Sequence, residues 1–480
     1  MKRLFFFLSF FSCLPAIAQN KILTMEEAIL KARTTLAPEN LKQLQFIYGT
    51  DDYVYLKKVD GKDVWMKGSN KTNETPFLTL EQLNAKLKAG ALDTTDAMPV
   101  IQFNQSPDWI VTVNKNKLGI NTSTNKIKTI IAKSISDKQN AEESKAGYIA
   151  YLDSFNLYVS TGKEAKQVTQ DGSKDIVYAS SVHREEFGIV KGTFWSNNGK
   201  VLAFYRMDQG MVADYPIIDW SKQPAKSENI KYPMAGGISH HVTVGVYNAE
   251  TKSLLYLKTG EPADQYLTNI TWSPDDKFIY IAVLNRGQDH LKLNQYNAST
   301  GALIKTLYEE TDEKYVEPLV PILFVKNNPN QYILQSNRDG WNHLYLFDIN
   351  GKFIKRLTTG KWEVLEVKGF DAGGENLFYV STAESPITKN LYQVNLLSGV
   401  TKRVTENPGV HNTQVSSDGN FVLDVSSTVD NPRTVQLIET KTGKVKLLLQ
   451  SANPLNDYAT GKLNIFTIKN DNATELYCRS

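Results

Sequence analysis

The chain has 480 residues, of which 54 are Lys or Arg and 51 are Asp or Glu, so its formal charge is +3 at pH 7. This near-neutral balance, without any block of like charge, excludes the electrostatic footprint of a nucleic-acid-binding protein and a polybasic membrane patch. Aromatic residues make up 10% of the chain, and Gly, Asn and Asp recur in short turns between apolar runs. That composition is typical of an all-β protein.

The first 18 residues have the pattern of a secretory signal peptide. Lys2 and Arg3 precede an almost unbroken apolar run, and Ala16-Ile17-Ala18 is an A-x-A cleavage motif. Cys13 leaves a lipoprotein signal as the alternative. We therefore predict residues 1–18 to be a signal peptide, cleaved after Ala18, that exports the protein to the periplasm or the extracellular space.

Cleavage changes two properties of the chain. The formal charge falls from +3 to +1, because the removed segment holds two basic residues and no acid. Cys478 becomes the only cysteine, which excludes an intrachain disulfide. No later stretch approaches the roughly 18 apolar residues of a membrane span, so we expect no membrane partner.

Two short helices are predicted near the N-terminus. Thr24-Met25-Glu26-Glu27 has the pattern of a capping box and opens a helix in the segment 19–45. Leu80 to Leu87 is expected to form the second helix.

Short β-hairpins repeat along most of the remaining chain. In one copy the turn residues Ser273-Pro274-Asp275-Asp276 precede an apolar run, and a second hairpin follows over Leu293 to Ile304. The polar turn of that second hairpin has eight related copies, at residues 59–62, 121–124, 161–163, 248–252, 297–301, 348–352, 395–399 and 439–443. From residue 248 onward they are roughly 45 to 50 residues apart, the length of a four-stranded propeller blade. Helical solenoids have repeats of similar length, but these runs alternate with a period of 2. We predict an eight-bladed β-propeller over residues 46–455.

One step of the repeat is nearly twice as long as the others. The turns that begin at residues 161 and 248 are 87 residues apart (248 − 161). The excess holds the pair Glu185-Glu186 and the segment Met207 to His241. We predict a substrate-binding insertion at about residues 180–241, because loops carry function on rigid scaffolds. Residues 205–241, rich in Tyr, Pro and Met, also have a purely structural interpretation as an extended packed insertion.

The insertion places two adjacent carboxylates beside a histidine and an arginine, in the order His183-Arg184-Glu185-Glu186. The structural interpretation is a solvated acidic pair with Arg184 as its salt-bridge partner. The functional interpretation is a cation site, since a bound ammonium group relieves the mutual repulsion of two carboxylates. His183 and Arg184 would then support the pair.

Other catalytic and metal-binding patterns are missing from the sequence. The six histidines form no metal-ligand spacing, and we expect structural or surface roles for all except His183. His240 and His241 would point to opposite faces of a strand. Gly237-Ile238-Ser239 lacks the second Gly of a nucleophile elbow, and neither a Walker loop nor a G-x-G-x-x-G motif occurs. We expect no metal and no cofactor.

An ordered series of motifs extends over residues 45 to 480. It comprises Asn156-Leu157-Tyr158-Val159, Val168 to Gly172, Val182 to Ile189, Phe194-Trp195-Ser196, Ala203 to Asp208, Tyr232 to Gly236, Arg338 to Tyr345, Trp362-Glu363-Val364 and Ser381 to Pro386. In this order the motifs resemble the N-terminal propeller region of the dipeptidyl peptidase IV family in its bacterial secreted form. The resemblance implies an eight-bladed propeller that caps an α/β-hydrolase domain. It also implies a Glu pair that binds the free α-amine of a peptide, from which the family removes a dipeptide with Pro or Ala usually second.

The resemblance maps the amine-binding pair onto Glu185 and Glu186 when one gap is placed before Phe187. Without that gap, Arg184 and Glu185 take the two positions. The family has a further Arg near the substrate, upstream of the pair, for which residues 100 to 150 offer no counterpart.

The end of the sequence resembles the first strands of the family's hydrolase domain, so we predict residues 456–480 to be its truncated start, with exposed strand edges. The resemblance places the catalytic Ser, Asp and His beyond these residues. We therefore expect the propeller part of a secreted serine exopeptidase, inactive alone, which binds peptide N-termini and works with the missing hydrolase domain. The alternatives are a stand-alone propeller that binds peptides or proteins and a half-enzyme complemented in trans. The resemblance also implies a homodimer of the full-length form.

Overall fold

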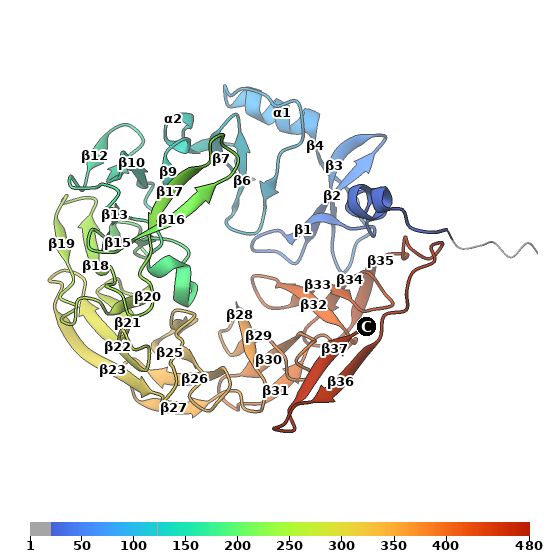
Figure 1. Cartoon of the computed structure of the whole chain (residues 1–480). Coiled ribbons are helices and arrows are strands. Elements are labelled where there is room, and N and C mark those ends of the chain that lie inside the picture. Colours follow the sequence, from blue (N-terminus) through green and yellow to red (C-terminus); the bar gives the residue numbers. More distant parts are fainter. Residues whose placement is uncertain (1–20, 122) are drawn as a thin grey trace, which may run out of the picture. The chain divides into compact units, whose positions relative to one another are not determined.

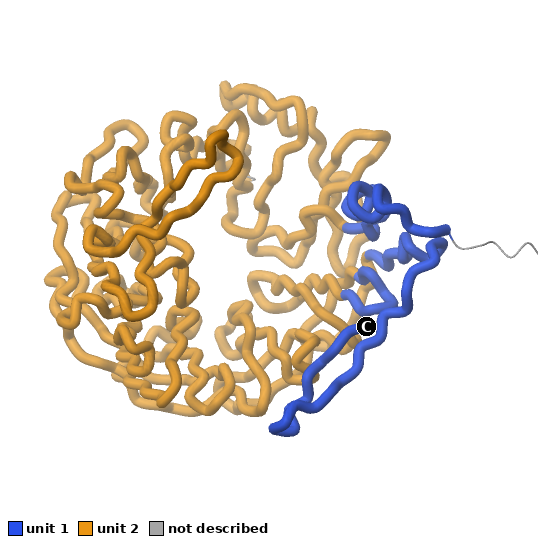
Figure 2. The backbone as a smooth tube through the Cα atoms, viewed as in Figure 1, with its two compact units in different colours: residues 1–40, 427–434, 449–480 blue, residues 41–426, 435–448 orange. Residues whose placement is uncertain are grey.

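The computed structural model describes residues 21–121 and 123–480 (Figure 1). The predicted signal peptide, residues 1–18, lies outside these residues. The chain divides into two compact units (Figure 2): unit 1 takes residues 1–40, 427–434 and 449–480, and unit 2 takes residues 41–426 and 435–448. Within the described ranges, no helix has both the length and the apolar character needed to cross a membrane.

Unit 1 contains the predicted N-terminal helix and a C-terminal hairpin. The π-helical turn η1 (Glu27–Lys31) follows Thr24, whose N–H donates to Glu27 Oε2 at 3.2 Å while Glu27 N–H donates to Thr24 Oγ1 at 3.2 Å. This reciprocal pair confirms the predicted capping box. Strands β36 (Ile465–Lys469) and β37 (Glu475–Arg479) pair antiparallel and are exposed along nearly their whole length. Their assignment to the start of a hydrolase domain stays a prediction.

Among its described residues, unit 2 has eight sheets of four or five strands, called blades 1 to 8 in chain order, and one separate two-stranded sheet. Blade 1 holds β1 (Lys42–Phe46), β2 (Tyr53–Val59), β3 (Lys62–Gly68) and β4 (Thr75–Thr79). Blade 2 holds β5 (Ile101–Gln102), β6 (Asp108–Val113), β7 (Asn116–Asn121) and β8 (Ile127–Ile131). Blade 3 holds β9 (Gln139–Glu143), β10 (Ile149–Asp153), β11 (Asn156–Ser160) and β12 (Ala165–Gln167). Blade 4 holds β13 (Ile176–Tyr178), β14 (Thr193–Trp195), β15 (Val201–Asp208), β18 (His241–Asn248) and β19 (Leu254–Tyr256).

The second half of the unit is more regular. Blade 5 holds β20 (Tyr266–Trp272), β21 (Phe278–Leu284), β22 (His290–Asn297) and β23 (Leu303–Thr311). Blade 6 holds β24 (Leu323–Val325), β25 (Asn328–Ser336), β26 (His343–Asp348) and β27 (Phe353–Arg356). Blade 7 holds β28 (Val364–Phe370), β29 (Asn376–Ser381), β30 (Asn390–Asn395) and β31 (Thr401–Arg403). Blade 8 holds β32 (Val410–Val415), β33 (Phe421–Ser427), β34 (Thr434–Glu439) and β35 (Val445–Gln450).

The predicted eight-bladed β-propeller is confirmed. The blades follow one another around a ring, with the first strand of a blade toward the centre and the fourth at the periphery (Figure 1). Eight apolar clusters each join one pair of neighbouring blades, instead of one central core. One of them packs Phe46 and Tyr55 of blade 1 against Phe421 and Leu437 of blade 8, which closes the ring. Stability is therefore distributed over the contacts between blades.

Local sequence explains a turn that recurs in three of the blades. In three blades a serine hydroxyl accepts a backbone N–H at the start of the second strand, and it also contacts an Asp or Asn two residues later. These residues are Ser196 with Asn198, Ser273 with Asp275 and Ser416 with Asp418. Such side-chain bonds stabilise tight turns.

One predicted turn has a different place in its blade. Seven of the eight turns join the third and fourth strands, but residues 59–62 join β2 to β3, the second and third strands of blade 1. The third and fourth strands of that blade are joined by residues 69–74 instead, which lack the recurring turn sequence. The predicted second helix is confirmed as α1 (Leu80–Ala89), where Thr79 and Gln82 form a capping box.

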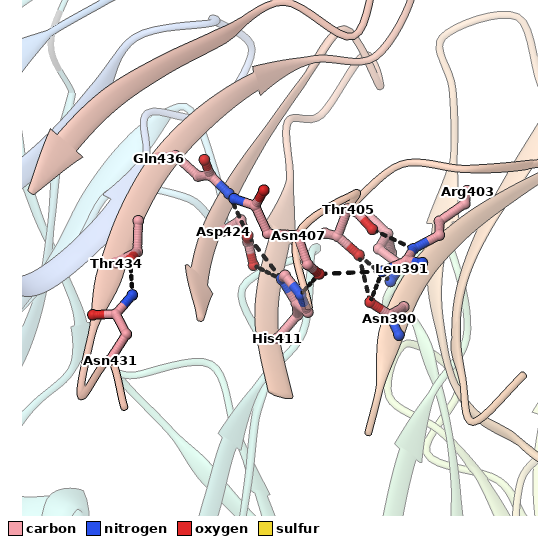
Figure 3. A network of polar contacts seen from close by, with 10 residues as sticks. All are labelled: Asn390, Leu391, Arg403, Thr405, Asn407, His411, Asp424, Asn431, Thr434 and Gln436. Carbon is pink, nitrogen blue, oxygen red and sulfur yellow. Dashed lines mark hydrogen bonds and ion pairs between the residues drawn. The ribbon is translucent and has the colours of Figure 1, made fainter. Parts of the chain in front are cut away.

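A buried polar network links blades 7 and 8 (Figure 3). The side chains of His411 and Asp424 are fully buried, and His411 Nδ1 lies 2.9 Å from each Asp424 oxygen. His411 Nε2 lies 2.9 Å from the carbonyl oxygen of Asn407, which also accepts a bond from Arg403 Nη2 at 3.1 Å. Gln436 Nε2 donates to Asp424 Oδ2 at 3.1 Å, so the buried carboxylate has partners on both oxygens.

Candidate functional site

The predicted insertion, residues 180–241, includes two strands of blade 4, β14 and β15, and the chain leaves the blade once before them and once after them. Strand β13 pairs with the end of β15 up to Tyr178↔Arg206, and β14 resumes the pairing at Thr193↔Phe204. Between them, Tyr205 O accepts from Ala179 N–H at 2.9 Å and Tyr205 N–H donates to Gly192 O at 3.0 Å. Residues 179–192 therefore loop out of the first strand and return to it beside one residue of β15.

The acidic pair lies on a left-handed turn in this loop. In η2 (His183–Gly188), His183, Arg184 and Glu185 have φ angles of 54°, 56° and 64°, and Phe187 has 57°. Each such non-glycine residue costs roughly 1–2 kcal/mol relative to right-handed backbone. Gly188 ends the turn at φ +71°, where a Cβ would lie 2.2 Å from Leu319 O, so only glycine fits. Backbone strain of this kind persists only where the surrounding structure holds it.

Two buried side chains, one on each side of the acidic pair, hold the turn. His183 and Phe187 both pack edge-to-face on Tyr266 of β20, with ring centroids 4.9 and 5.2 Å away. The intervening Arg184, Glu185 and Glu186 are exposed. Burial of the two rings against blade 5 offsets the cost of the turn and fixes the backbone that carries the carboxylates.

Hydrogen bonds define the proton positions on the buried histidines. Leu267 N–H donates to His183 Nε2 at 3.2 Å, so that nitrogen carries no proton. His183 Nδ1 lies 2.7 Å from His240 Nε2, and it must be the donor of that bond. His240 Nε2 is then the acceptor, which leaves the proton of a neutral His240 on Nδ1. We call this chain the imidazole relay.

The pKa values of the two buried histidines also indicate that both rings are neutral. Burial, with smaller contributions from His240 and Arg286, holds the pKa of His183 well below its usual value. Burial together with Arg184 and Arg286 lowers the pKa of His240 to about 4. Both imidazoles are therefore uncharged at neutral pH, and neither supplies a positive charge to the acidic pair.

The two carboxylates face different cavities. Glu186 lines a cavity of about 820 Å³ and Glu185 lines one of about 290 Å³, while Arg184 and His240 border both. Glu185 Oε1 accepts a bond from Ser181 Oγ at 3.3 Å. Within residues 21–121 and 123–480, neither carboxylate has an ion-pair partner. The Arg184 guanidinium lies over the Tyr232 ring instead, 5.5 Å from its centroid. The predicted salt bridge between Arg184 and the acidic pair is therefore wrong.

The larger cavity carries charges of both signs. Besides Glu186 and Arg184 it is lined by Asp264 and Arg286. Arg286 Nη1 donates to the hydroxyl of Tyr266, and its guanidinium lies 5.5 Å from the centroid of that ring. A cavity with separate acidic and basic groups suits a ligand that has both an ammonium group and oxygen acceptors.

The rest of the insertion is a hairpin, β16 (Asp214–Asp219) and β17 (Lys226–Lys231). Nearly all of its residues are exposed, including Ile217 and Trp220, the latter with 80% of its surface accessible. The interpretation of residues 205–241 as a packed insertion is therefore wrong for this hairpin. Alternating apolar side chains without a facing sheet cannot bury each other on one two-stranded ribbon.

Other motif residues serve the blades and not the site. In blade 6 the Tyr345 hydroxyl donates to Asp339 at 2.7 Å and Arg356 pairs with Asp339 at 2.9 Å. The same acid, tyrosine and arginine arrangement recurs in two other places, as Glu384, Tyr392 and Arg403 and as Asp171, Tyr178 and Arg206. In blades 6 and 7 these residues join the third strand to the fourth, and in blade 4 they join the first strand to the second.

Comparison with known proteins identifies the family. Residues 96–433 match the family model described as dipeptidyl peptidase IV (DPP IV) N-terminal region. The chain belongs to this family. A relative of this DPP IV propeller region is dipeptidyl-aminopeptidase B of Aspergillus niger, 26% identical over 366 residues that span 67% of the chain and 40% of the relative. The chain thus corresponds to less than half of that longer protein.

Solved structures agree with this assignment. A chain from Bacteroides ovatus, assigned as a dipeptidyl aminopeptidase IV, is 35% identical and superposes with a TM-score of 0.85 over 96% of this chain and 67% of that one. Dipeptidyl peptidase 4 of Porphyromonas gingivalis superposes with a TM-score of 0.77 over 95% of this chain and 66% of that one, at 20% identity. The second similarity supports the fold alone.

The sequence predicted His183, Arg184, Glu185 and Glu186, and the structure brings these four together on one turn. Three further residues around that turn were not predicted from the sequence, namely His240, Tyr266 and Arg286. His240 pairs with a residue 57 positions away, so no local pattern could have indicated the contact.

Proposed function

We propose that this chain is the peptide-binding propeller region of an exported serine exopeptidase of the dipeptidyl peptidase type. In this proposal Glu185 and Glu186 anchor the free α-amine of the peptide, and Arg184 and His183 support them. One observation carries it: a strained turn presents two adjacent carboxylates, without an internal ion-pair partner in the described chain, beside a cavity of about 820 Å³. An ammonium group relieves the repulsion between such carboxylates.

Glu186 is proposed as the stronger anchor. Its side chain lines the larger cavity, whereas Glu185 faces the smaller one and accepts a bond from Ser181. Replacement of Glu186 should therefore cost more affinity than replacement of Glu185. In the gapped alignment both carboxylates bind the amine, so replacement of either Glu185 or Glu186 should lower the affinity for the peptide.

The test is calorimetric binding of Gly-Pro-Phe amide and of its N-acetylated form at pH 7. We expect binding of the free amine to weaken about 10-fold or more in Glu186→Gln and less in Glu185→Gln, because a hydrogen bond to a charged group contributes about 1.5–3 kcal/mol. Acetylation should abolish the difference between variants. Glu313→Gln, an exposed acid outside both cavities, is the matched control. Equal binding of the free and the acetylated peptide would contradict the amine anchor.

Hydrolysis is proposed to require the α/β-hydrolase domain of the family. The hydrogen-bonded histidines in the described part of the chain pair with an imidazole, carboxylates, a threonine hydroxyl and backbone groups. We expect residues 1–480 to release no chromophore from a Gly-Pro reporter. Turnover that survives repurification would contradict this expectation, and turnover that appears only when a hydrolase domain is added would favour the half-enzyme.

Export and assembly complete the proposal. A mature N-terminus at Gln19 in secreted protein would support cleavage after Ala18, whereas an uncleaved Met1 would contradict it. The homodimer of the full-length form stays a prediction, which light scattering of the full-length protein tests.

A further inference from the structure

A further cavity, of about 290 Å³, borders the junction of blades 8 and 1 at which the ring closes. Its walls include Phe46 of β1, Asn104 shortly after β5, Lys368 of β28 and Thr413 to Val415 of β32. These are the first strands of blades 1, 2, 7 and 8, which lie toward the centre of the ring (Figure 1). We call this space the seam cavity. None of the residues that line it lines the two cavities beside the acidic pair.

The seam cavity presents hydrogen-bond donors around a single charge. Among the described residues that line it, Lys368 is the one charged side chain, and no carboxylate is present. Asn104 and Gln414 carry amide groups. Ser417 Oγ accepts the Gly49 N–H at 3.2 Å, which leaves its own proton to donate elsewhere. A cation with neutral donors around it, and without an acid, suits an anion.

A buried hydroxyl gives independent evidence for a ligand in this cavity. Thr413, which lines the cavity, is only 2% exposed, and its Oγ1 is buried without a hydrogen-bond partner among the described residues. Buried polar groups of this kind are rare in native proteins, so each requires an explanation. Valine would fill the same space without an unpaired hydroxyl. An acceptor atom of a ligand, to which Oγ1 donates, explains why a threonine is there.

Lys368 has one partner in the protein and further protons for a ligand. Its Nζ lies 2.7 Å from Glu366 Oε2, with the Lys368 side chain 17% exposed and the Glu366 side chain 58% exposed. An ammonium group has three N–H donors, so two remain after this contact. An exposed ion pair contributes little free energy, so a ligand can compete with it. Glu366 itself does not line the cavity.

We propose that the seam cavity binds a small oxyanion, with Lys368 Nζ and Thr413 Oγ1 as its main donors. Free phosphate or sulfate and the terminal carboxylate of a peptide share this chemistry. The bound anion joins blade 7 to blade 8 through these two donors, and Asn104 offers it an amide from the other side of the seam. The site is independent of the proposed amine anchor, because the two share no lining residue.

The test is equilibrium dialysis of ³²P-labelled phosphate with the 480-residue protein at pH 7 and low ionic strength. We expect one saturable site per chain, with affinity about 10-fold or more weaker in Lys368→Gln and about 3-fold weaker in Thr413→Val. Glu366→Gln removes the competing carboxylate at an exposed position and should tighten binding about 3-fold. Lys361→Gln, at an exposed lysine outside the cavity, is the matched control and should bind as wild type does.

Competition distinguishes the sources of the oxyanion. Displacement of phosphate by N-acetyl-Ala-Ala, but not by its C-terminal amide, identifies a peptide carboxylate as a ligand, whereas displacement by sulfate alone identifies a free tetrahedral oxyanion. Both results support the site. Absence of saturable phosphate binding by wild-type protein, equal affinity in Lys368→Gln, or unchanged affinity in Glu366→Gln overturns it.

Two further measurements separate this site from misfolding and from the amine anchor. Without phosphate, Thr413→Val should be as stable as wild type or more stable in urea unfolding, because no internal hydrogen bond is lost. A destabilised Thr413→Val would show that Oγ1 has a partner within the unliganded protein, which overturns the proposal. Lys368→Gln should bind Gly-Pro-Phe amide as tightly as wild type does, so the two sites fail independently.

Discussion

Two buried histidine pairs in the propeller differ in what faces their ring nitrogens. In blade 8 both nitrogens of His411 face oxygen acceptors, the carboxylate of Asp424 and the carbonyl of Asn407 (Figure 3). At the candidate site, one nitrogen of His183 faces the Leu267 N–H and the other faces His240. The first ring therefore faces acceptors on both nitrogens, whereas the second ring faces a donor on one nitrogen and must be neutral.

The two regions also differ in how their carboxylates are placed. Blade 8 buries its acid, pairs it with His411 and Gln436, and leaves nothing for a ligand. The candidate site buries neutral rings and exposes Glu185 and Glu186 beside two cavities. In blade 8 a buried contact between a histidine and an aspartate therefore serves the fold. At the candidate site, neutral imidazoles hold a turn whose acids have no ion-pair partner among the described residues.

The largest effect is expected from Asp424→Ala. The substitution leaves His411 and Gln436 without their buried partner, and each buried polar group left unpaired costs roughly 1–3 kcal/mol. Urea unfolding should show this loss, whereas binding of Gly-Pro-Phe amide should not change. Asp430→Ala, an exposed acid, is the control and should lie within about 0.5 kcal/mol of wild type. If Asp424→Ala lowers the free energy of unfolding by less than about 1 kcal/mol, the contact between His411 and Asp424 does not serve the fold as proposed, and the contrast with the candidate site fails.

A smaller loss of stability, with a large loss of binding, is expected from His183→Ala. The variant leaves the buried Leu267 N–H unpaired, which costs roughly 1–3 kcal/mol, and it frees the strained turn that carries the acids. His183→Gln, whose amide oxygen can accept the same N–H, should recover part of both losses. His290→Ala, a partly exposed histidine of blade 5, is the matched control. If His183→Ala is destabilised but binds Gly-Pro-Phe amide as tightly as wild type, the His183 ring contributes to stability and not to binding.

The sequence could predict the blades because their signals are local. Polar turns, alternating apolar runs and one over-long step each lie within a few residues or within one repeat, and together they indicated eight sheets and the place of the insertion. The turn at residues 59–62 shows the limit, since a similar turn can join a different pair of strands. Counting turns gave the right number of blades, but it did not give the place of each turn within its blade.

The geometry of the site could not be predicted in the same way. Arg and Glu have no preference for positive φ, so nothing in Arg184-Glu185 indicated a left-handed turn. The packing of His183 and Phe187 on Tyr266 depends on two blades meeting, and the contact with His240 depends on the return of the β16–β17 hairpin. Local sequence identified the charged residues, and tertiary contacts determine how they are presented.

Replacement of His240 by Gln is expected to change how the free energy of unfolding depends on pH. The unfolded chain protonates His240 near pH 6.5, whereas burial lowers the pKa in the folded protein to about 4. Between these values the unfolded state binds more protons, so the contribution of His240 to the free energy of unfolding falls as the pH falls. At pH 7 the variant should be less stable than wild type by at most about 1 kcal/mol, because the amide oxygen of Gln can accept the His183 bond only in part as well as His240 does. The difference in free energy of unfolding between wild type and variant should narrow or reverse as the pH is lowered to 4. Paired urea titrations measure this difference. A gap that is constant with pH would mean that His240 is not held neutral.

The smallest effect is expected from Arg184→Gln. The guanidinium is exposed and lies over Tyr232, an interaction that contributes about 0.5–1 kcal/mol. Burial is the main cause of the low pKa of His240, and Arg184 is the next. Its removal should therefore raise the pKa of His240, by less than about one pH unit, without restoring the usual value. A ¹⁵N titration of the labelled histidines measures this shift, with His290 as an internal reference. An unchanged pKa of His240 would mean that the charged residues of the turn do not influence the imidazole relay electrostatically. The exposed acids and the buried rings would then be linked by packing alone.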